Sequence, residues 1–365
     1  MKKIILLFLI SLSFVTCTAK SNQEAEQQLF QILKKKDFFR LENLLEEKRA
    51  ELSKDVVLYI DAHLQNAFNR TEHSSQIIDS LLNNYDKSLN DTLLLDAFVL
   101  RYNNLRKLYR YNEAADAMKI AIDKYSYTSD DITKLQNLYN GIDLLKEFPQ
   151  QKMHITDNVT IPTSLNQLNH IIMSVSNGEQ SENFVFDTGA SMNVVSENSA
   201  QRLGIRVLES SVSAFGVTGK EVKFKTGITD TLWIGNLMFE NVVFMVLSDE
   251  LLSFPEADYI IHGIIGFPVF SQMKEIVIRK NKSITVVANP TKRNIRNMFF
   301  DGTHHIVRLE ANSDTLLFFM DTGAIISTFS GNYFTANSAE IIDKATKNTM
   351  RRGGVDGFMI TKCMI

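Results

Sequence analysis

The chain has 365 residues, of which 44% are hydrophobic and 22% are charged, and its formal net charge at pH 7 is −3. This length is enough for two or three domains, and the composition is that of a folded globular protein. The small net charge, together with the lack of a basic stripe with interleaved aromatic residues, argues against nucleic acid as a partner.

The first 19 residues have the pattern of a targeting segment. Two lysines are followed by an apolar stretch, Ile4–Val15, that is too short to span a bilayer. We therefore expect a bacterial-type signal peptide over residues 1–19, rather than a buried first helix, and an exported protein of the cell envelope. Cys17 resembles the acylated cysteine of a lipoprotein signal, and ordinary cleavage after Ala19 is the alternative. The only membrane contact that we expect is a lipid anchor at Cys17.

Residues 23–151 predict a helical domain. Gly141 and Pro149 are the only glycine and proline of this stretch, and apolar residues recur at intervals of three and four, as in amphipathic helices. Residues 96–125 predict a helix, a turn and a returning helix, whose small-residue pattern resembles a tetratricopeptide repeat. We expect the following residues to form the facing sides of the two helices: Ala97, Leu100, Leu105, Tyr109, Ala114, Ala115, Met118 and Ala121.

The rest of the chain is rich in Val, Ile, Thr and Phe, with regular Gly and Asn, which indicates a mainly-β region. Asn169–Val175 and Glu182–Phe186 predict a hairpin, because the Asn177-Gly178 pair between them strongly favours a tight turn. We also expect Trp233 and the Phe-rich runs to lie in the core. Further predicted elements are a short helix at Ser196–Leu203 that ends at Gly204 and strands at Val222–Lys225, Thr231–Ile234 and Asn241–Leu247.

An internal repeat carries one tetrapeptide twice. Asp187-Thr188-Gly189-Ala190 follows the apolar run ENFVF, and Asp321-Thr322-Gly323-Ala324 follows LLFFM. The second copy is preceded by two predicted strands, His305–Glu310 and Leu316–Met320, with a turn near Asn312-Ser313. One structural unit therefore occurs twice, and each copy presents one carboxylate.

On these motifs, residues from about 160 to 365 resemble the retropepsin and pepsin class of aspartic proteases, and the D-T-G-A form is that of retroviral-type enzymes. The resemblance implies a multidomain protein: all-α helical hairpins, then a mainly-β bilobal domain with lobe one at residues 155–290 and lobe two at 291–365. It implies an aspartic endopeptidase that acts on a peptide or protein substrate, with Asp187 and Asp321 as the catalytic pair and with no cofactor.

Two carboxylates at hydrogen-bonding range cannot both ionise easily, so they share one proton and titrate as a pair. The ionised member takes a proton from a bound water, and the protonated member donates to the scissile carbonyl. Ala190 and Ala324 stand where pepsin-like enzymes have Ser or Thr. Without that hydroxyl, we expect a higher pKa for the pair and a mildly acidic or neutral pH optimum.

The resemblance also implies supporting residues. Thr188 and Thr322 would lock the two turns together, while Gly189 and Gly323 would allow close backbone approach. A flap over the substrate would have its tip at Phe215, Gly216, Val217, Thr218 and Gly219, with a counterpart at Gly354–Gly357, and the loop of lobe one would be closed by Ile264, Ile265 and Gly266.

An equivalent of the Ile264-Ile265-Gly266 element in lobe two would lie past Ile365, so we expect lobe two to be incomplete. Three explanations stay open: a truncated product of a longer gene, a degenerate and inactive second lobe, or dimerisation through lobe one. We expect a half-lobe with open strand edges to fold poorly.

The remaining candidates favour structural roles. His304 and His305 are adjacent in a strand and point to opposite faces, so they make a poor chelate, and we expect no metal site. His262 and Cys363 are interpreted as a loop residue and a small strand residue. The alternative function is a catalytically inactive envelope lipoprotein that binds a peptide or a partner through a degenerate protease fold. In either case, the helical domain is a candidate partner-binding surface or a simple packing domain.

Overall fold

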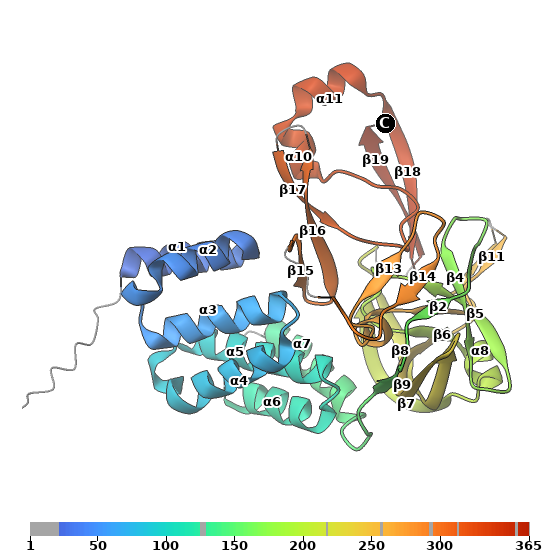
Figure 1. Cartoon of the computed structure of the whole chain (residues 1–365), viewed down its shortest axis with the longest axis horizontal. Coiled ribbons are helices and arrows are strands. Elements are labelled where there is room, and N and C mark those ends of the chain that lie inside the picture. Colours follow the sequence, from blue (N-terminus) through green and yellow to red (C-terminus); the bar gives the residue numbers. More distant parts are fainter. Residues whose placement is uncertain are drawn as a thin grey trace, which may run out of the picture.

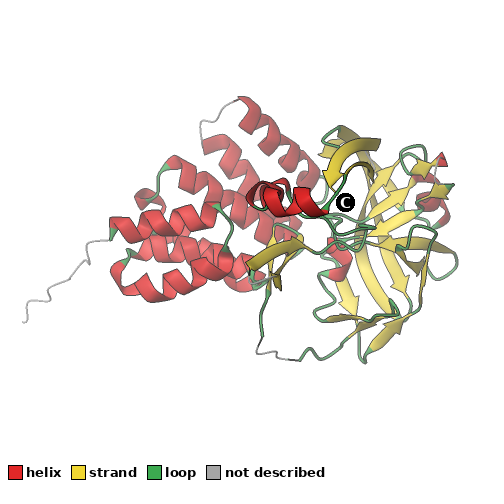
Figure 2. Ribbon diagram, turned by 90° about the horizontal axis from the view of Figure 1, so that it is seen from above, coloured by secondary structure: helices red, strands yellow, loops and turns green. Residues whose placement is uncertain are grey.

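The computed structural model describes residues 22–124, 129–216, 218–255, 258–291, 295–311, 314–354 and 357–364. The expected signal peptide and Cys17 lie outside these residues. A helical part is followed along the chain by a mainly-β part, as predicted, and the two lie against each other (Figures 1 and 2).

The helices form a series of neighbouring antiparallel hairpins. Asn22, Asp37 and Asn90 each accept a hydrogen bond from a backbone N–H of the helix that follows, which satisfies a donor that the helix itself leaves open. In the described part of the chain, no helix is long and apolar enough to cross a membrane. The helices are α1 (Gln23–Lys34), α2 (Phe38–Lys48), α3 (Lys54–Ala67), α4 (Thr71–Asn84), α5 (Asp91–Lys107), α6 (Tyr111–Lys124) and α7 (Ser129–Asp143).

The predicted helix–turn–helix unit is confirmed as α5 and α6. Tyr109 lies in the turn with φ of 59°, and all eight residues expected on the facing sides are buried. Four of the eight are alanines, whose small side chains let the two helices approach closely. The likeness to a tetratricopeptide repeat stays a prediction, because helical hairpins are common to many all-α folds.

Lobe one is built around a sheet that closes on itself, since β9 pairs with both β6 and β8. The strands run in the order β1-β9-β6-β12-β5-β4-β8-β7, with β3 on β4. They are β1 (Lys152–His154), β3 (Thr163–Leu165), β4 (Ile171–Ser176), β5 (Ser181–Phe186), β6 (Val194–Ser196), β7 (Arg206–Phe215), β8 (Glu221–Ile234), β9 (Leu237–Leu247) and β12 (Gly263–Ile265).

Smaller elements complete this lobe. The predicted short helix is confirmed as α8 (Glu197–Arg202), which is capped by Ser196 and ends before Gly204 at φ of 63°. A separate sheet pairs β13 with β14 and β14 with β2. The remaining elements are β2 (Val159–Ile161), β10 (Ser253–Phe254), β11 (Tyr259–Ile260), α9 (Phe267–Phe270), β13 (Ile276–Ile278) and β14 (Ile284–Val286).

Two expectations for lobe one were wrong. The strands predicted at Val222–Lys225 and Thr231–Ile234 are parts of the single strand β8. Trp233 is not a core residue: it is 36% exposed, whereas Leu232 and Ile234 beside it are fully buried. Successive side chains of a strand point to opposite faces, and Trp233 lies on the outer face of β8.

Lobe two repeats the hairpin of lobe one. Ile172 pairs with Val185 in the first hairpin, and Ile306 pairs with Phe319 in the second, so the same register recurs 134 residues later (306 − 172 = 134 and 319 − 185 = 134). The turn near Asn312-Ser313 lies outside the described residues. The elements are β15 (Met298–Asp301), β16 (His304–Ala311), β17 (Asp314–Phe319), α10 (Gly331–Ala336), α11 (Ser338–Lys344), β18 (Lys347–Gly354) and β19 (Gly357–Met364).

Many large apolar side chains of lobe two face solvent. The exposed residues include Leu309, Leu317, Phe319, Ile325, Ile326, Phe329, Ile342 and Ile360.

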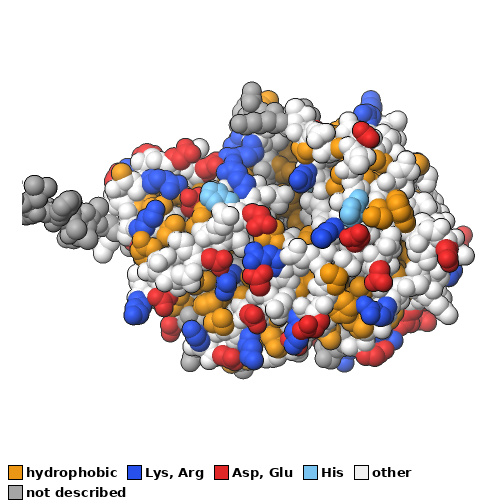
Figure 3. Space-filling view, turned by 60° about the horizontal axis from the view of Figure 1, so that its bottom comes forward, with side chains coloured by type: hydrophobic (Ala, Val, Ile, Leu, Met, Phe, Trp, Pro, Cys, Tyr) orange, Lys and Arg blue, Asp and Glu red, His pale blue; other side chains and the backbone are white. Residues whose placement is uncertain are grey.

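The helical part packs against both lobes. Phe299 of β15 is 2% exposed and belongs to the apolar core of helices α1 to α5, and Tyr109 donates a hydrogen bond to the Pro268 carbonyl at 2.5 Å. On the other side, Asn137 of α7 donates to the Ser213 carbonyl of β7 at 3.2 Å. On the face shown in Figure 3, acidic and basic side chains are interspersed over both parts. The helices are therefore an integral support of the β part.

Candidate active site

The two D-T-G-A turns meet. Asp187 follows β5, and its backbone N–H donates to the Ile265 carbonyl at 3.0 Å. Asp321 follows β17, and the N–H of Met320 before it donates to the His305 carbonyl at 2.8 Å. Each aspartate thus leaves the end of a strand whose backbone is already bonded to a neighbouring strand, which fixes the direction of the turn.

The two carboxyl groups lie within hydrogen-bonding range of each other. Gly189 N–H donates to Asp187 Oδ1 at 2.8 Å, and Gly323 N–H donates to Asp321 Oδ1 at 2.8 Å. A Cβ at Gly189 would lie 2.6 Å from Asp321 Oδ1, and one at Gly323 would lie 2.6 Å from Asp187 Oδ2. Only glycine therefore allows each turn to approach the opposite carboxyl.

Thr188 and Thr322 form a symmetric set of four hydrogen bonds. Each hydroxyl accepts from the backbone N–H of the other threonine at 3.0 Å. The Thr188 hydroxyl also donates to the Met320 carbonyl at 2.9 Å, and the Thr322 hydroxyl donates to the Phe186 carbonyl at 2.8 Å. These bonds join two segments that are 134 residues apart in the sequence, so they hold the two turns together as expected.

Burial and the neighbouring carboxyl raise the pKa of Asp187 to about 7, while backbone N–H groups of Gly189 and Ala190 partly oppose the shift. The direction agrees with the expectation of a high pKa for the pair. The physical cause lies first in desolvation and then in the charge of Asp321, and not chiefly in the hydroxyl missing at Ala190. A carboxyl of this kind holds its proton near neutral pH.

The loop support of lobe one has the predicted residues and one that sequence reasoning missed. Ile264 and Ile265 pair with β5 in parallel, and Gly266 N–H donates to Asn193 Oδ1 at 3.0 Å. Asn193 is fully buried and donates to the Val243 carbonyl at 3.0 Å. A lone amide inside the apolar run MNVV was the available signal, since a buried polar side chain needs partners.

The predicted flap is a hairpin between β7 and β8. Phe215 pairs with Glu221, Gly216 N–H donates to the Lys220 carbonyl at 3.2 Å, and Gly219 has φ of 79°. Thr218 lies in this turn, and Val217 lies outside the described residues. The hairpin thus has the predicted form, and its closure over a substrate stays a prediction.

The counterpart in lobe two is the hairpin of β18 and β19. Gly354 pairs with Gly357, which has φ of 105°, and the two residues between them lie outside the described part. Cys363 lies in β19 and has a free thiol, as expected of a small strand residue.

The adjacent histidines of lobe two do not form a chelate. The His304 ring contacts Phe319, whereas His305 is buried between Phe270 and Phe300, so the two point to opposite faces as predicted. His262 lies in a loop. Among the residues with a described placement, no group of three His, Cys, Asp or Glu side chains has the arrangement of a metal site.

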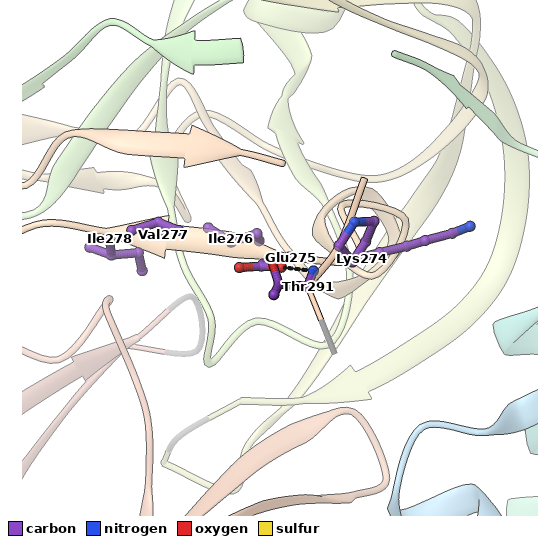
Figure 4. A pocket seen from close by; sticks show the side chains of 7 residues that line it. Lys274, Glu275, Ile276, Val277, Ile278 and Thr291 are labelled. Atoms are coloured by element: carbon purple, nitrogen blue, oxygen red, sulfur yellow. Dashed lines mark hydrogen bonds between the residues drawn. The ribbon is translucent and has the colours of Figure 1, made fainter. Parts of the chain in front are cut away.

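Surface depressions lie away from the two turns. One of about 470 Å³ is lined by residues of β13 and by Thr291, whose N–H donates to Glu275 Oε2 at 2.7 Å (Figure 4). Another of about 330 Å³ includes Arg202, Asp249 and His262. Neither contains a residue of the D-T-G-A motifs, so neither belongs to the candidate site.

A family model and a solved structure match parts of this chain. A family model described as aspartyl protease matches residues 172–269, which include the first D-T-G-A turn and Ile264-Ile265-Gly266. The chain is similar to a solved structure of a retropepsin-like aspartic protease from Rickettsia conorii, with 20% identity over 38% of this chain and 92% of that one and a TM-score of 0.26. No curated protein matches. The family match lies within lobe one and spans its hairpin, its D-T-G-A turn and the Ile264-Ile265-Gly266 element.

Proposed function

We propose that the protein is an aspartic endopeptidase that hydrolyses peptide bonds with a water activated between Asp187 and Asp321. The observation that carries the proposal is the pairing of the two carboxyls, held by reciprocal threonine bonds across the turns. A purely structural pair of buried acids would be costly, because two like charges at this range repel each other. Their retention on matching turns supports a shared catalytic role.

In the proposed reaction, the ionised carboxyl of the Asp187–Asp321 pair takes a proton from the water as the water oxygen attacks the carbonyl carbon, and the protonated carboxyl donates its proton to the carbonyl oxygen. The resulting tetrahedral diol collapses when the pair gives a proton to the amide nitrogen and takes one from a diol hydroxyl, so that the C–N bond breaks and the C=O bond re-forms. The pair ends with one proton, as it began, and no covalent intermediate with the enzyme forms.

We further propose that the protein works in the cell envelope, where an extended peptide or an unfolded protein would be its substrate. The support is the apolar segment Ile4–Val15 and Cys17, which favour export and a lipid anchor. The helical part would then hold the β part near a partner or near the membrane. Mass spectrometry of the mature N-terminus would distinguish a lipid on Cys17 from cleavage after Ala19.

Cleavage of a peptide library between pH 4 and pH 8 tests the catalytic proposal. We expect turnover by the unchanged protein and a loss of roughly 10²–10⁴-fold in Asp187→Asn and in Asp321→Asn. Asp230→Asn is the matched control, because this carboxylate is exposed on β8. Pepstatin-type inhibitors should block turnover. Binding of peptides without turnover at any pH would instead favour the inactive binding protein.

A further inference from the structure

Two phenylalanine rings meet at the boundary between the lobes. Phe267 begins α9 of lobe one, and Phe300 lies in β15 of lobe two. Both side chains are buried, and their ring centroids are 5.9 Å apart at an interplanar angle of 76°. This edge-to-face geometry is one of the arrangements that aromatic pairs prefer. We call the contact the inter-lobe ring pair, because it joins the two lobes directly.

Each ring of the inter-lobe ring pair leads to one catalytic turn. The Phe267 N–H donates to the Ala190 carbonyl of the first D-T-G-A motif at 2.9 Å. Phe300 contacts the His305 ring at 4.5 Å between centroids. The His305 carbonyl accepts from the N–H of Met320, the residue before the second motif, at 2.8 Å. A displacement of either ring should therefore move the turn of its own lobe.

A lysine of the helical part lies against both rings. Lys107 is the last residue of α5, and its Nζ atom lies 5.9 Å from the Phe267 ring centroid and 5.8 Å from the Phe300 ring centroid. An ammonium group within about 6 Å of a ring centroid is attracted to the negative face of the ring. The Nζ atom also donates to Asn66 Oδ1 of α3 at 3.3 Å. One cation thus contacts the helical part and both lobes.

The turn that follows Lys107 is fixed to the same helix of lobe one. The Tyr109 hydroxyl donates to the Pro268 carbonyl and lies 2.8 Å from the Ser271 hydroxyl. Gln151 Nε2 donates to the same Pro268 carbonyl at 2.7 Å. These bonds hold the end of α5 against α9, so the position of Lys107 beside the inter-lobe ring pair is determined by the fold.

We propose that Lys107 is a positioning residue for the catalytic pair: its ammonium group holds Phe267 and Phe300 together and so fixes the two catalytic turns relative to each other. The inference rests on the proposed function, because the part that the two turns play in cleavage is itself proposed. The threonine bonds join the turns directly, whereas Lys107 holds the elements from which the turns extend. The helical part thereby contributes to the geometry of the active site.

The charge of Lys107 determines the conditions of the test. Burial lowers the pKa of Lys107 to about 7, the charge of Arg106 adds to this shift, and the charge of Asp301 opposes it. The neighbouring His305 is neutral above about pH 5, because burial lowers its pKa to about 4. At pH 6 most of the Lys107 side chains are therefore charged, and an assay at this pH compares the cation with its replacements.

Lys107→Met and Lys107→Arg test the role of the charge at pH 6. Methionine keeps a long flexible side chain without the cation, whereas arginine keeps a cation that stacks on aromatic rings. We expect kcat to fall about 10- to 100-fold in Lys107→Met, with KM within about threefold of its original value, because misplaced catalytic groups weaken the transition state more than substrate binding. Lys107→Arg should recover most of the loss.

Lys119→Met is the matched control, because Lys119 is an exposed lysine of α6, and its kcat should equal that of the unchanged protein. An unchanged kcat in Lys107→Met would overturn the proposal. An equal loss of kcat in Lys107→Met and Lys107→Arg would also overturn it, since the charge would then have no role.

A second measurement does not need turnover. The N–H groups of Thr188 and Thr322 each donate to the opposite threonine hydroxyl, so their hydrogen exchange reports how firmly the two turns are held together. We expect exchange in peptides that contain these residues, followed by mass spectrometry at pH 6, to be about 10-fold faster in Lys107→Met. The exchange in Lys119→Met should equal that of the unchanged protein.

Phe300→Leu keeps Lys107 and an apolar side chain but removes one ring, so it should accelerate the same exchange and serves if Lys107→Met does not fold. Unchanged exchange in both variants would overturn the proposal. If the unchanged protein cleaves no peptide while the acceleration is present, the endopeptidase proposal fails and the role of Lys107 in holding the lobes stands.

Discussion

Thr188 and Thr322 exchange hydrogen bonds across the two catalytic turns, since each hydroxyl accepts from the other's backbone N–H at 3.0 Å. Each hydroxyl also donates to the carbonyl of the residue before the opposite aspartate. The separation of the two carboxyls is therefore set by four bonds between the lobes. The threonines connect the fold to the chemistry, because a small displacement of one turn changes how the pair shares a proton.

Replacement of a threonine by valine should loosen this lock. Thr188→Val keeps the shape but leaves the Thr322 N–H and the Met320 carbonyl without their partner, which should cost about 2–4 kcal/mol in the free energy of unfolding. Urea unfolding of the β part, followed by the fluorescence of Trp233, the only tryptophan, measures the loss. Thr188→Ser retains the hydroxyl and is the control. Equal stability of the Val and Ser variants would contradict the prediction.

Asp187 should make stability depend on pH in an unusual direction. Its pKa in the folded protein is about 7, above the value of about 3.9 in an unfolded chain. Because the folded state holds the proton more tightly, this contribution is fully present below about pH 4 and is lost as pH rises to about 7. The loss is at most about 4 kcal/mol, and less when the two carboxyls share it.

The substitution Asp187→Asn isolates this contribution. The variant should gain stability relative to the unchanged protein as pH rises from 4 to 8, because the amide has no charge to desolvate. Urea midpoints at several pH values give the difference between the two proteins. Asp230→Asn, which alters an exposed carboxylate, should follow the unchanged protein. A constant difference between Asp187→Asn and the unchanged protein at all pH values would argue against a raised pKa.

Local sequence patterns predicted the structural features that depend only on residues close together in the sequence. The hairpin at Asn177-Gly178 and the doubled D-T-G-A turns are of this kind, because turn chemistry and strand alternation are local properties. The gap left between the strands expected at Val222–Lys225 and Thr231–Ile234 was wrong for a tertiary reason. A Cβ at Gly227 would lie 2.7 Å from a Val246 methyl and 2.9 Å from an Ile205 methyl, so this glycine serves packing within β8 and does not mark a turn.

Other features need partners that the sequence does not reveal. Asn193 is a single polar residue whose role depends on Gly266, which lies 73 residues further along the chain. Trp233 was assigned to the core on hydrophobicity alone, but the face of a strand is set by its register, and one residue of shift exchanges the faces. The docking of Phe299 among the helices is likewise a long-range contact without a local signal.

Gly266 should tolerate no side chain. A Cβ there would lie 2.3 Å from the Met192 carbonyl oxygen and 2.8 Å from that of Ala190, and backbone atoms cannot rotate away as a side chain can. Gly266→Ala should therefore cost more than about 3 kcal/mol, with loss of cleavage because the Asp187 turn shifts. Gly331→Ala, with nothing within 4 Å of its Cβ, is the control for urea unfolding. Comparable stability of the two variants would mean that the loop adjusts freely.

Phe299 should be the main anchor between the helices and lobe two. It contacts Phe38 and Phe39 at ring-centroid distances of 5.1 and 5.7 Å, and it is almost fully buried in the helical core. The nearby ion pair between Lys36 and Asp301 is exposed, and exposed pairs contribute about 0–1 kcal/mol. Phe299→Ala should cost about 3–5 kcal/mol, far more than Asp301→Asn.

β15 pairs with β16, and β16 pairs with β17, which leads into Asp321. Loss of the Phe299 anchor should therefore also change the position of Asp321. We expect Phe299→Ala to lower kcat at temperatures where the helices remain folded by circular dichroism, whereas Phe329→Ala, whose ring is 56% exposed, should leave both properties near those of the unchanged protein. Unchanged kcat in Phe299→Ala, despite a less stable helical part, would show that lobe two holds its position without the helices. A reduced kcat would instead show that the helical part helps to position the two aspartates.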